Sequence, residues 1–195
     1  SSPRSGGFRR PRFLLAALAV LGATVVVAPQ PAAAARPKVL LIGDSTLAAL
    51  DWYASSQRQL RGLDYVLEAE SCRAVTATSC VGRTSANGTR IRPTNALSVL
   101  RSYPAGTFEE LVLMVGYDES ASAFRESVVE LPRVARDLGV DHITWLTFRT
   151  DVDYDAPVDD SSYRGNNRLL YAAAESSGGY IDLLDWDYWV DNHSG

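Results

Sequence analysis

Asp44 and Ser45 are the residues whose types and position most directly suggest chemistry. They follow Gly43 at the end of the stretch 38–42, which is continuously apolar after Lys38, and they precede a helical pattern of apolar residues. A strand, a tight turn and a helix in this order would place Ser45 at a helix N-terminus, among unpaired N–H groups and at the positive end of the helix dipole. Such a position suits a nucleophile that creates and stabilises an oxyanion. The alternative is that Asp44 or Ser45 only caps the helix, which is the commonest use of these residue types.

A nucleophilic serine needs a base that takes its proton, and the sequence contains two histidines. His142 begins a predicted strand, whereas the site is expected where the strands end, so His142 should lie on the surface, out of reach of Ser45. His193 follows the last predicted strand, on the correct edge of the sheet. It is therefore the candidate base within this sequence, and the alternative is a surface histidine.

Several segments, in the same order, resemble the SGNH (GDSL-type) family of esterases and lipases, in particular its secreted actinobacterial members. The segment 43–47, Gly-Asp-Ser-Thr-Leu, is similar to the first block of the family. The segment 116–119, Gly-Tyr-Asp-Glu, stands where the family has Gly-x-Asn-Asp. Further similarities lie at Glu70-Ser-Cys72-Arg73, Ser79-Cys80 and Tyr163-x-x-x-Asn167. The resemblance implies a carboxylic-ester hydrolase that works through an acyl-enzyme on Ser45.

The residues that would stabilise an oxyanion depart from the pattern of that family. The family uses a glycine N–H from its second block and an asparagine side chain from its third. Here the N–H of Cys72 or Arg73 would replace the glycine, and Asp118 stands in place of the asparagine. An ionised carboxylate repels an oxyanion and offers no proton, so Asp118 would serve only if it were protonated or if a neighbour such as Arg73 carried the charge. Alternatively, Asp118 only caps the next helix.

The last block of the family, Asp-x-x-His, is not matched. Val190 stands three residues before His193, and the nearest acid is Asp191. The family also continues past its histidine into a C-terminal helix. The resemblance therefore implies a sequence cut short at both ends, with the usual base beyond Gly195 and His193 as the less favoured candidate.

The N-terminal segment has the features of a secretory signal peptide. Arginines precede an apolar run over residues 13–28, and a small-residue site ends at Ala35. We expect residues 1–35 to be removed and the protein to be secreted, extracellular or cell-wall associated, without a stable membrane span; the alternative is an N-terminal anchor. Cleavage would take away four arginines and no acid, so the net charge of −4 would become −8. Such a balance argues against a nucleic-acid partner.

Cys72 and Cys80 are the two cysteines, and an even count in an exported chain predicts a disulfide between them. Two free thiols are the alternative. No metal site is predicted. The acidic stretch 151–160 has spaced carboxylates, but Ala156 and Ser162 stand where a calcium loop needs glycine and a bidentate glutamate.

Apolar patterning predicts a single domain over residues 36–195 in which strands and helices alternate. Strands are expected at 38–42, 63–69, 111–115, 143–148 and 180–184, and helices at 47–60, 94–100, 124–138 and 162–177. Pro132 is expected to kink or restart the third helix. This alternation predicts a three-layer α/β/α fold with a parallel, flavodoxin-like sheet. Ser45, Cys72, Asp118, Arg149 and residues 185–193 should gather at the carboxyl ends of its strands.

The function predicted on these grounds is that of a secreted serine hydrolase acting on a small-molecule or glycan ester without a cofactor. One alternative is a glycan O-deacetylase or acyltransferase that uses the same serine. The other is a catalytically impaired relative that binds a cell-wall glycan or a partner, a reading favoured by Asp118 and by the unmatched last block. The oligomeric state and the acyl length are left open by the sequence.

Overall fold

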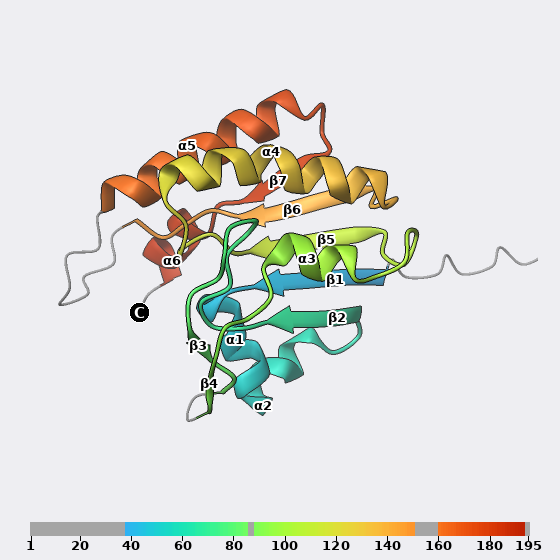
Figure 1. The fold of residues 1–195 in the computed structure, drawn as a ribbon, viewed down its shortest axis with the longest axis vertical. Coiled ribbons are helices and arrows are strands. Elements are labelled where there is room, and N and C mark those ends of the chain that lie inside the picture. The colour runs from blue at the N-terminus through green and yellow to red at the C-terminus, as the bar shows by residue number, and fades with distance from the viewer. Residues whose placement is uncertain (1–37, 86–87, 151–159, 194–195) are drawn as a thin grey trace, which may run out of the picture. The chain divides into compact units, whose positions relative to one another are not determined.

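The computed structural model describes residues 38–85, 88–150 and 160–193 (Figure 1). The predicted signal peptide, residues 1–35, and the acidic residues 151–159 lie outside the described part. Among the described residues, no helix combines the length and the apolar character that crossing a membrane requires.

Five parallel strands form the central sheet, in the order β2-β1-β5-β6-β7. They are β1 (Lys38–Gly43), β2 (Asp64–Ala69), β5 (Glu110–Met114), β6 (His142–Leu146) and β7 (Ile181–Leu184). Numbered along the chain within this sheet, the order is 2-1-3-4-5, which is the flavodoxin-like arrangement. The predicted fold class is therefore confirmed.

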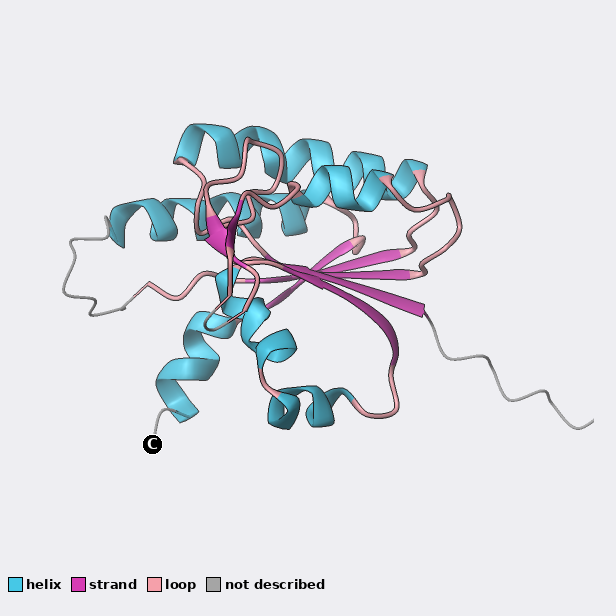
Figure 2. Cartoon of the chain, turned by 60° about the horizontal axis from the view of Figure 1, so that its bottom comes forward, coloured by secondary structure: helices cyan, strands magenta, loops and turns pink. Residues whose placement is uncertain are grey.

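Helices cover both faces of the sheet (Figure 2). The helices are α1 (Ser45–Trp52), α2 (Ala54–Gln57), α3 (Ala96–Arg101), α4 (Ala121–Asp137), α5 (Asp160–Ser176) and α6 (Trp186–His193), with a short turn of helix, η1, at Arg58–Leu60. Residues of α3, α4 and α5 pack with one face, and residues of α1, η1 and α6 pack with the other. The layers are those of an α/β/α sandwich.

The apolar run of β1 shows why the strands read as continuous hydrophobic segments. Leu40 and Ile42 belong to the core on the side of α3, α4 and α5, whereas Leu41 belongs to the core on the side of α1. Successive side chains of a strand point to opposite faces, so a strand covered on both sides needs apolar residues at every position. The carboxyl end of β1 is thereby fixed next to that of β5, where Gly43 pairs with Met114.

Some elements differ from the sequence-based expectations. The helix predicted over 47–60 is interrupted at Tyr53, whose backbone is extended (φ −125°, ψ 115°). The stretch 71–93, expected to be loop, contains a small antiparallel pair of strands, β3 (Gly82–Arg83) and β4 (Arg90–Ile91). The helix α4 continues through Pro132 and does not restart there. The helix α6 was not predicted as such.

Candidate functional site

Ser45 is the first residue of α1, directly after the carboxyl end of β1. Its side chain is exposed, whereas the neighbouring Asp44 is fully buried. Among the described residues, neither the N–H nor the hydroxyl of Ser45 has a hydrogen-bond partner. The first N–H groups of a helix have no partner within the helix, so this end of α1 can accept an anionic oxygen.

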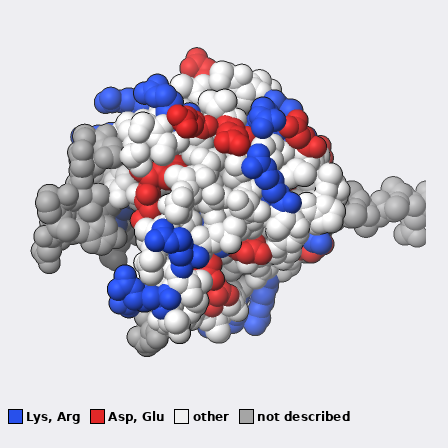
Figure 3. All heavy atoms as spheres, in the orientation of Figure 1, with Lys and Arg blue, Asp and Glu red and all other residues white. Residues whose placement is uncertain are grey.

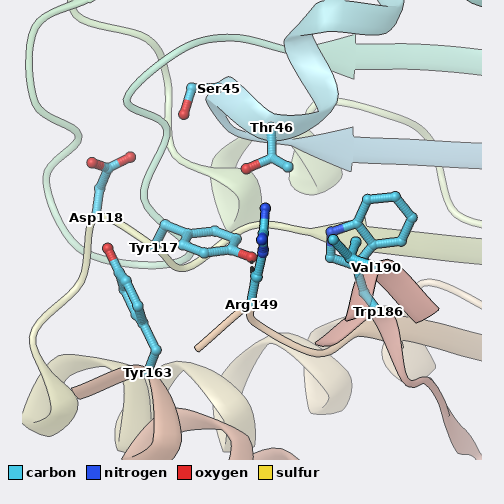
Figure 4. A pocket seen from close by; sticks show the side chains of 8 residues that line it. All are labelled: Ser45, Thr46, Tyr117, Asp118, Arg149, Tyr163, Trp186 and Val190. Carbon is cyan, nitrogen blue, oxygen red and sulfur yellow. Dashed lines mark hydrogen bonds between the residues drawn. The ribbon is translucent and has the colours of Figure 1, made fainter. Parts of the chain in front are cut away.

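Ser45 opens into a cavity of about 440 Å³ at the carboxyl ends of the strands. Its lining comes from five segments of the chain: Ser45, Thr46, Tyr117, Asp118, Arg149, Tyr163, Trp186 and Val190. Figure 4 shows the Ser45 hydroxyl and the Asp118 carboxylate at one end of this cavity, and Arg149 on the other side of the Tyr117 ring. The structure thus brings together Ser45, Asp118, Arg149 and part of the segment 185–193, as the strand order predicted.

Asp44 joins the turn after β1 to the loop after β5. Its Oδ1 accepts the N–H of Thr46 at 3.1 Å, and its Oδ2 accepts the N–H groups of Gly116 and Tyr117 at 3.2 and 3.3 Å. Asp44 is therefore the N-cap of α1, which was one of the two roles considered for it from the sequence. Ser45 does not cap the helix, and its side chain is exposed. Burial raises the pKa of Asp44 to about 7, and the charge of Asp118 adds to this, against the opposing effect of the N–H donors.

Gly116 allows the loop after β5 to approach Asp44. Its backbone has a φ of +128°, and a Cβ atom at this position would lie 2.6 Å from the ring of Phe124 and 2.8 Å from that of Phe148. Only glycine fits both this backbone conformation and the space between these rings. The fixed conformation places the next two residues, Tyr117 and Asp118, at the cavity.

Cys72 lies beside Asp118 and is bonded to Cys80, so the predicted disulfide is confirmed. A carboxylate oxygen of Asp118 and both sulfur atoms lie within 4.8 Å of one another. The sulfur atoms are joined to each other and so are not thiolate ligands for a metal.

Cys72 has a φ of +75°, the left-handed conformation that favours glycine. Its N–H has no partner in the described part of the chain, whereas the N–H of Arg73 donates to Glu70 O at 3.3 Å.

Glu119 fixes the backbone on the other side of Asp118. Its carboxylate is buried and accepts the N–H groups of Val75, Thr76 and Ala77 at 2.9–3.0 Å, and the hydroxyl of Ser127 at 2.9 Å. The loop that follows Cys72 is thereby tied to the loop that carries Asp118. Asp118 does not cap α4, because that role belongs to Ser120, whose hydroxyl accepts the N–H of Ala123.

Arg73 does not compensate the charge of Asp118, contrary to one expectation. Its side chain is only 2% exposed, and the guanidinium donates to the carbonyl oxygens of Gly43 and Thr94. Through these hydrogen bonds the guanidinium joins the end of β1 to the loop before α3. Asp118 is exposed at the surface of the cavity, but partial burial of its carboxyl group raises the pKa above its usual value.

The two histidines lie at different ends of the fold. His142 begins β6, at the end of the sheet away from the cavity, and its Nε2 lies 3.3 Å from Asp182 Oδ2. His142 therefore lies where the sequence analysis expected it, at the beginning of a strand and away from Ser45. His193 is the last residue of α6, three residues after Val190, which lines the cavity. The side chain of His193 lies outside the described part of the structure.

Tyr117 is a cavity residue to which the sequence analysis gave no role, and Tyr163, which was noted only as a similarity to the family, lies in the same cavity. The Tyr117 hydroxyl accepts the N–H of Arg149 at 2.7 Å, and its ring packs edge-on against those of Phe148 and Tyr163. Burial raises the pKa of Tyr117. Asn167 fixes the same region, since its amide exchanges hydrogen bonds of 2.7 and 2.8 Å with the backbone of Phe148. The position of Tyr117, directly after Gly116 and at the end of a predicted strand, is the feature of the sequence that could have indicated a place in the cavity.

The chain matches no model of a known protein family, and no curated protein matches its sequence. Its fold is similar to that of LAE5, an alpha/beta hydrolase enzyme from the metagenome of Lake Arreo, Spain. The two are 13% identical, the match covers 80% of this chain and 82% of that one, and the TM-score is 0.50. A second similar structure is a carbohydrate esterase family 2 enzyme with a carbohydrate binding domain from Corynascus thermopiles (Myceliophthora fergusii), with 14% identity and a TM-score of 0.49. That match covers 80% of this chain, which spans 58% of the length of that enzyme. At 13% identity, the similarity to LAE5 establishes a shared α/β fold.

Proposed function

We propose that this protein is a secreted serine hydrolase that cleaves carboxylic esters through an acyl-enzyme on Ser45. The observation that carries the proposal is the exposed hydroxyl of Ser45 at the N-terminus of α1, inside a cavity of about 440 Å³. The order of segments that resembles SGNH hydrolases supports the same role for Ser45. The Cys72–Cys80 disulfide supports export, because disulfides persist in oxidising compartments.

The reaction would begin with attack of Ser45 Oγ on the carbonyl carbon of the ester while a base takes the hydroxyl proton. The carbonyl oxygen becomes an oxyanion, for which the N–H groups of Ser45 and Cys72 are the available backbone donors. The bond from carbon to the leaving oxygen then breaks, and the alcohol departs with the proton from the base. Water next attacks the acyl group, its proton passes through the base to Ser45 Oγ, and the carboxylic acid is released.

We propose that a histidine is the base of this reaction. Within the sequence His193 is the candidate, because it ends α6, the helix whose residues Trp186 and Val190 line the cavity. The resemblance to SGNH hydrolases favours instead a histidine encoded after Gly195.

Small-molecule and glycan esters are the proposed substrates. On the face drawn in Figure 3, basic and acidic side chains are interspersed among the coloured residues, without a continuous basic surface. Such a surface, together with the excess of acids in the sequence, favours an uncharged or weakly charged substrate over nucleic acid.

A binding protein without catalytic activity is the second candidate, and Asp118 is the observation that favours it. Its carboxylate shares the cavity with Ser45, and an ionised carboxylate there would oppose the oxyanion of an ester hydrolase. A glycan O-deacetylase or acyltransferase would use Ser45 in the same way as an esterase. A covalent probe separates the catalytic proposals from the binding protein.

We expect a fluorophosphonate probe to label the protein expressed from its complete gene, because an activated serine attacks the phosphorus as it would attack an ester. Ser45→Ala should abolish the labelling. Thr46→Ala is the matched control, since Thr46 is also exposed and lines the same cavity, and it should retain the labelling. Labelling that persists in Ser45→Ala, or no labelling of the wild-type protein, would contradict the proposal.

A further inference from the structure

The surroundings of Asp118 are unusual for a carboxylate next to a nucleophile. Among the described residues, Asp118 forms no ion pair and accepts no hydrogen bond. The groups near it are a second carboxyl group, Asp44, the Tyr163 hydroxyl and the Cys72–Cys80 disulfide, whereas the Tyr117 hydroxyl is turned toward the N–H of Arg149 (Figure 4). Asp118 is exposed, so an ionised carboxylate would be solvated by water rather than paired with a protein group, while its charge would act on both Asp44 and the reacting oxygen.

Asp118 cannot easily turn away from the cavity, because the backbone is anchored on both sides of it. The N–H groups of Gly116 and Tyr117 bind Asp44, and the side chain of Glu119 binds the loop that follows Cys72. Gly116 adds a backbone conformation that other residues rarely adopt. The carboxyl group is thus held beside Ser45, where its protonation state decides whether it repels or binds an oxyanion.

We propose that Asp118 serves this hydrolase as a protonated carboxylic acid that donates a hydrogen bond to the oxyanion, so that the enzyme works on the acidic side of neutrality. This inference rests on the proposed function. A protonated carboxyl has one O–H donor, whereas the ionised form has only acceptors. The same group therefore stabilises the transition state when it is protonated and opposes it when it is ionised. No bond to Asp118 forms or breaks, and its proton stays on the carboxyl group throughout the reaction.

Two protonation requirements then shape the dependence of the rate on pH. The histidine base must be neutral, which requires a pH that is not too low, and Asp118 must be protonated, which requires a pH that is not too high. The result is a bell-shaped profile of kcat/KM whose alkaline limb belongs to Asp118. Because Asp44 and Asp118 repel each other when both are charged, the limb reports the titration of the pair rather than of one residue.

The test compares the pH profile of kcat/KM for a short p-nitrophenyl ester between wild type and Asp118→Asn. The carboxamide donates a hydrogen bond at every pH, so the variant should lose the alkaline limb. At pH 8 we expect Asp118→Asn to exceed wild type by about 100-fold, the usual effect of one oxyanion donor, and at pH 5 the two should agree within about threefold. Asp141→Asn, an exposed acid just before β6 at the opposite end of the sheet, should keep the wild-type profile.

Infrared difference spectra of wild type against Asp118→Asn provide a readout besides activity, because a protonated carboxyl has its own C=O stretching band. We expect that band at pH 5 and its loss as the pH rises. Ester hydrolysis with the same profile in both proteins, or an Asp118 that is already ionised at pH 5, would overturn the inference and leave the role of Ser45 intact. A protein that hydrolyses no ester at any pH would contradict the proposed function, and the inference with it.

Discussion

Ser45→Ala is expected to lower kcat/KM for a short ester by about 10⁴-fold or more, because alanine leaves no nucleophile and the remaining oxyanion donors give only residual catalysis. The substitution removes one exposed hydroxyl oxygen that has no partner among the described residues, so the fold should be retained. The measurement is the hydrolysis of p-nitrophenyl acetate by the product of the complete gene, at pH 5 to 6, with circular dichroism and thermal unfolding as checks of the fold.

Thr46→Ala is the control for this loss and should change kcat/KM by less than about tenfold, since Thr46 lines the cavity without being the nucleophile. His193→Ala in the same series tests the base. A loss as large as that of Ser45→Ala would assign the base to His193, and an unchanged rate would assign it to a histidine after Gly195. Hydrolysis by Ser45→Ala at the wild-type rate would refute the nucleophile.

The second large effect is on stability, and it arises from Asp44. Burial raises its pKa in the folded protein from 3.8 to about 7, so the folded state binds a proton more tightly than the unfolded state does. When the pKa of an acid is higher in the folded than in the unfolded protein, its contribution to stability is complete at pH values below the unfolded-state pKa. This contribution is lost as the pH rises through the folded-state pKa. We therefore expect the free energy of unfolding to fall by roughly 3 kcal/mol between pH 4 and pH 7 on account of Asp44.

Urea unfolding of wild type and Asp44→Asn at pH 4.5 and pH 7.5 checks this prediction. Asparagine keeps the size of the side chain and an oxygen for the Thr46 N–H but does not titrate, so the variant should show a weaker dependence on pH. The comparison is needed because Glu70 and Asp118 also have raised pKa values and contribute in the same direction. Equal pH dependence in the two proteins would show that the three N–H donors outweigh the burial of Asp44.

The sequence contains enough information to predict the sheet and its helices. Strands buried on both faces appear as apolar runs such as 38–42, and the spacing of apolar residues over 124–138 indicates a helix that the structure shows as α4. Once the strands are known to be parallel, their carboxyl ends lie at one edge, which predicts that Ser45, Asp118 and Arg149 meet. The break at Tyr53 was missed because apolar spacing continues across it, while only the backbone conformation of one residue changes.

The contacts that fix the site could not be predicted from the sequence. The bonds from Gly116 and Tyr117 to Asp44 join residues more than seventy positions apart, and those from Val75, Thr76 and Ala77 to Glu119 join residues about forty apart. A sequence shows that an acid follows a strand but not which N–H groups it will meet. The suggestion that Arg73 could compensate the charge of Asp118 failed for the same reason. The partners of Arg73 are backbone carbonyl groups, which carry no signal in the sequence.

The central claim is that Ser45 becomes acylated, and peptide mapping by mass spectrometry tests it most directly. The protein expressed from its complete gene is mixed with p-nitrophenyl acetate, quenched in acid within the first turnovers and digested. We predict that the peptide containing Ser45 gains the mass of one acetyl group and that fragmentation places this group on the Ser45 oxygen. An acetyl group on another residue, or hydrolysis without any acylated peptide at the shortest times, would contradict the acyl-enzyme on Ser45.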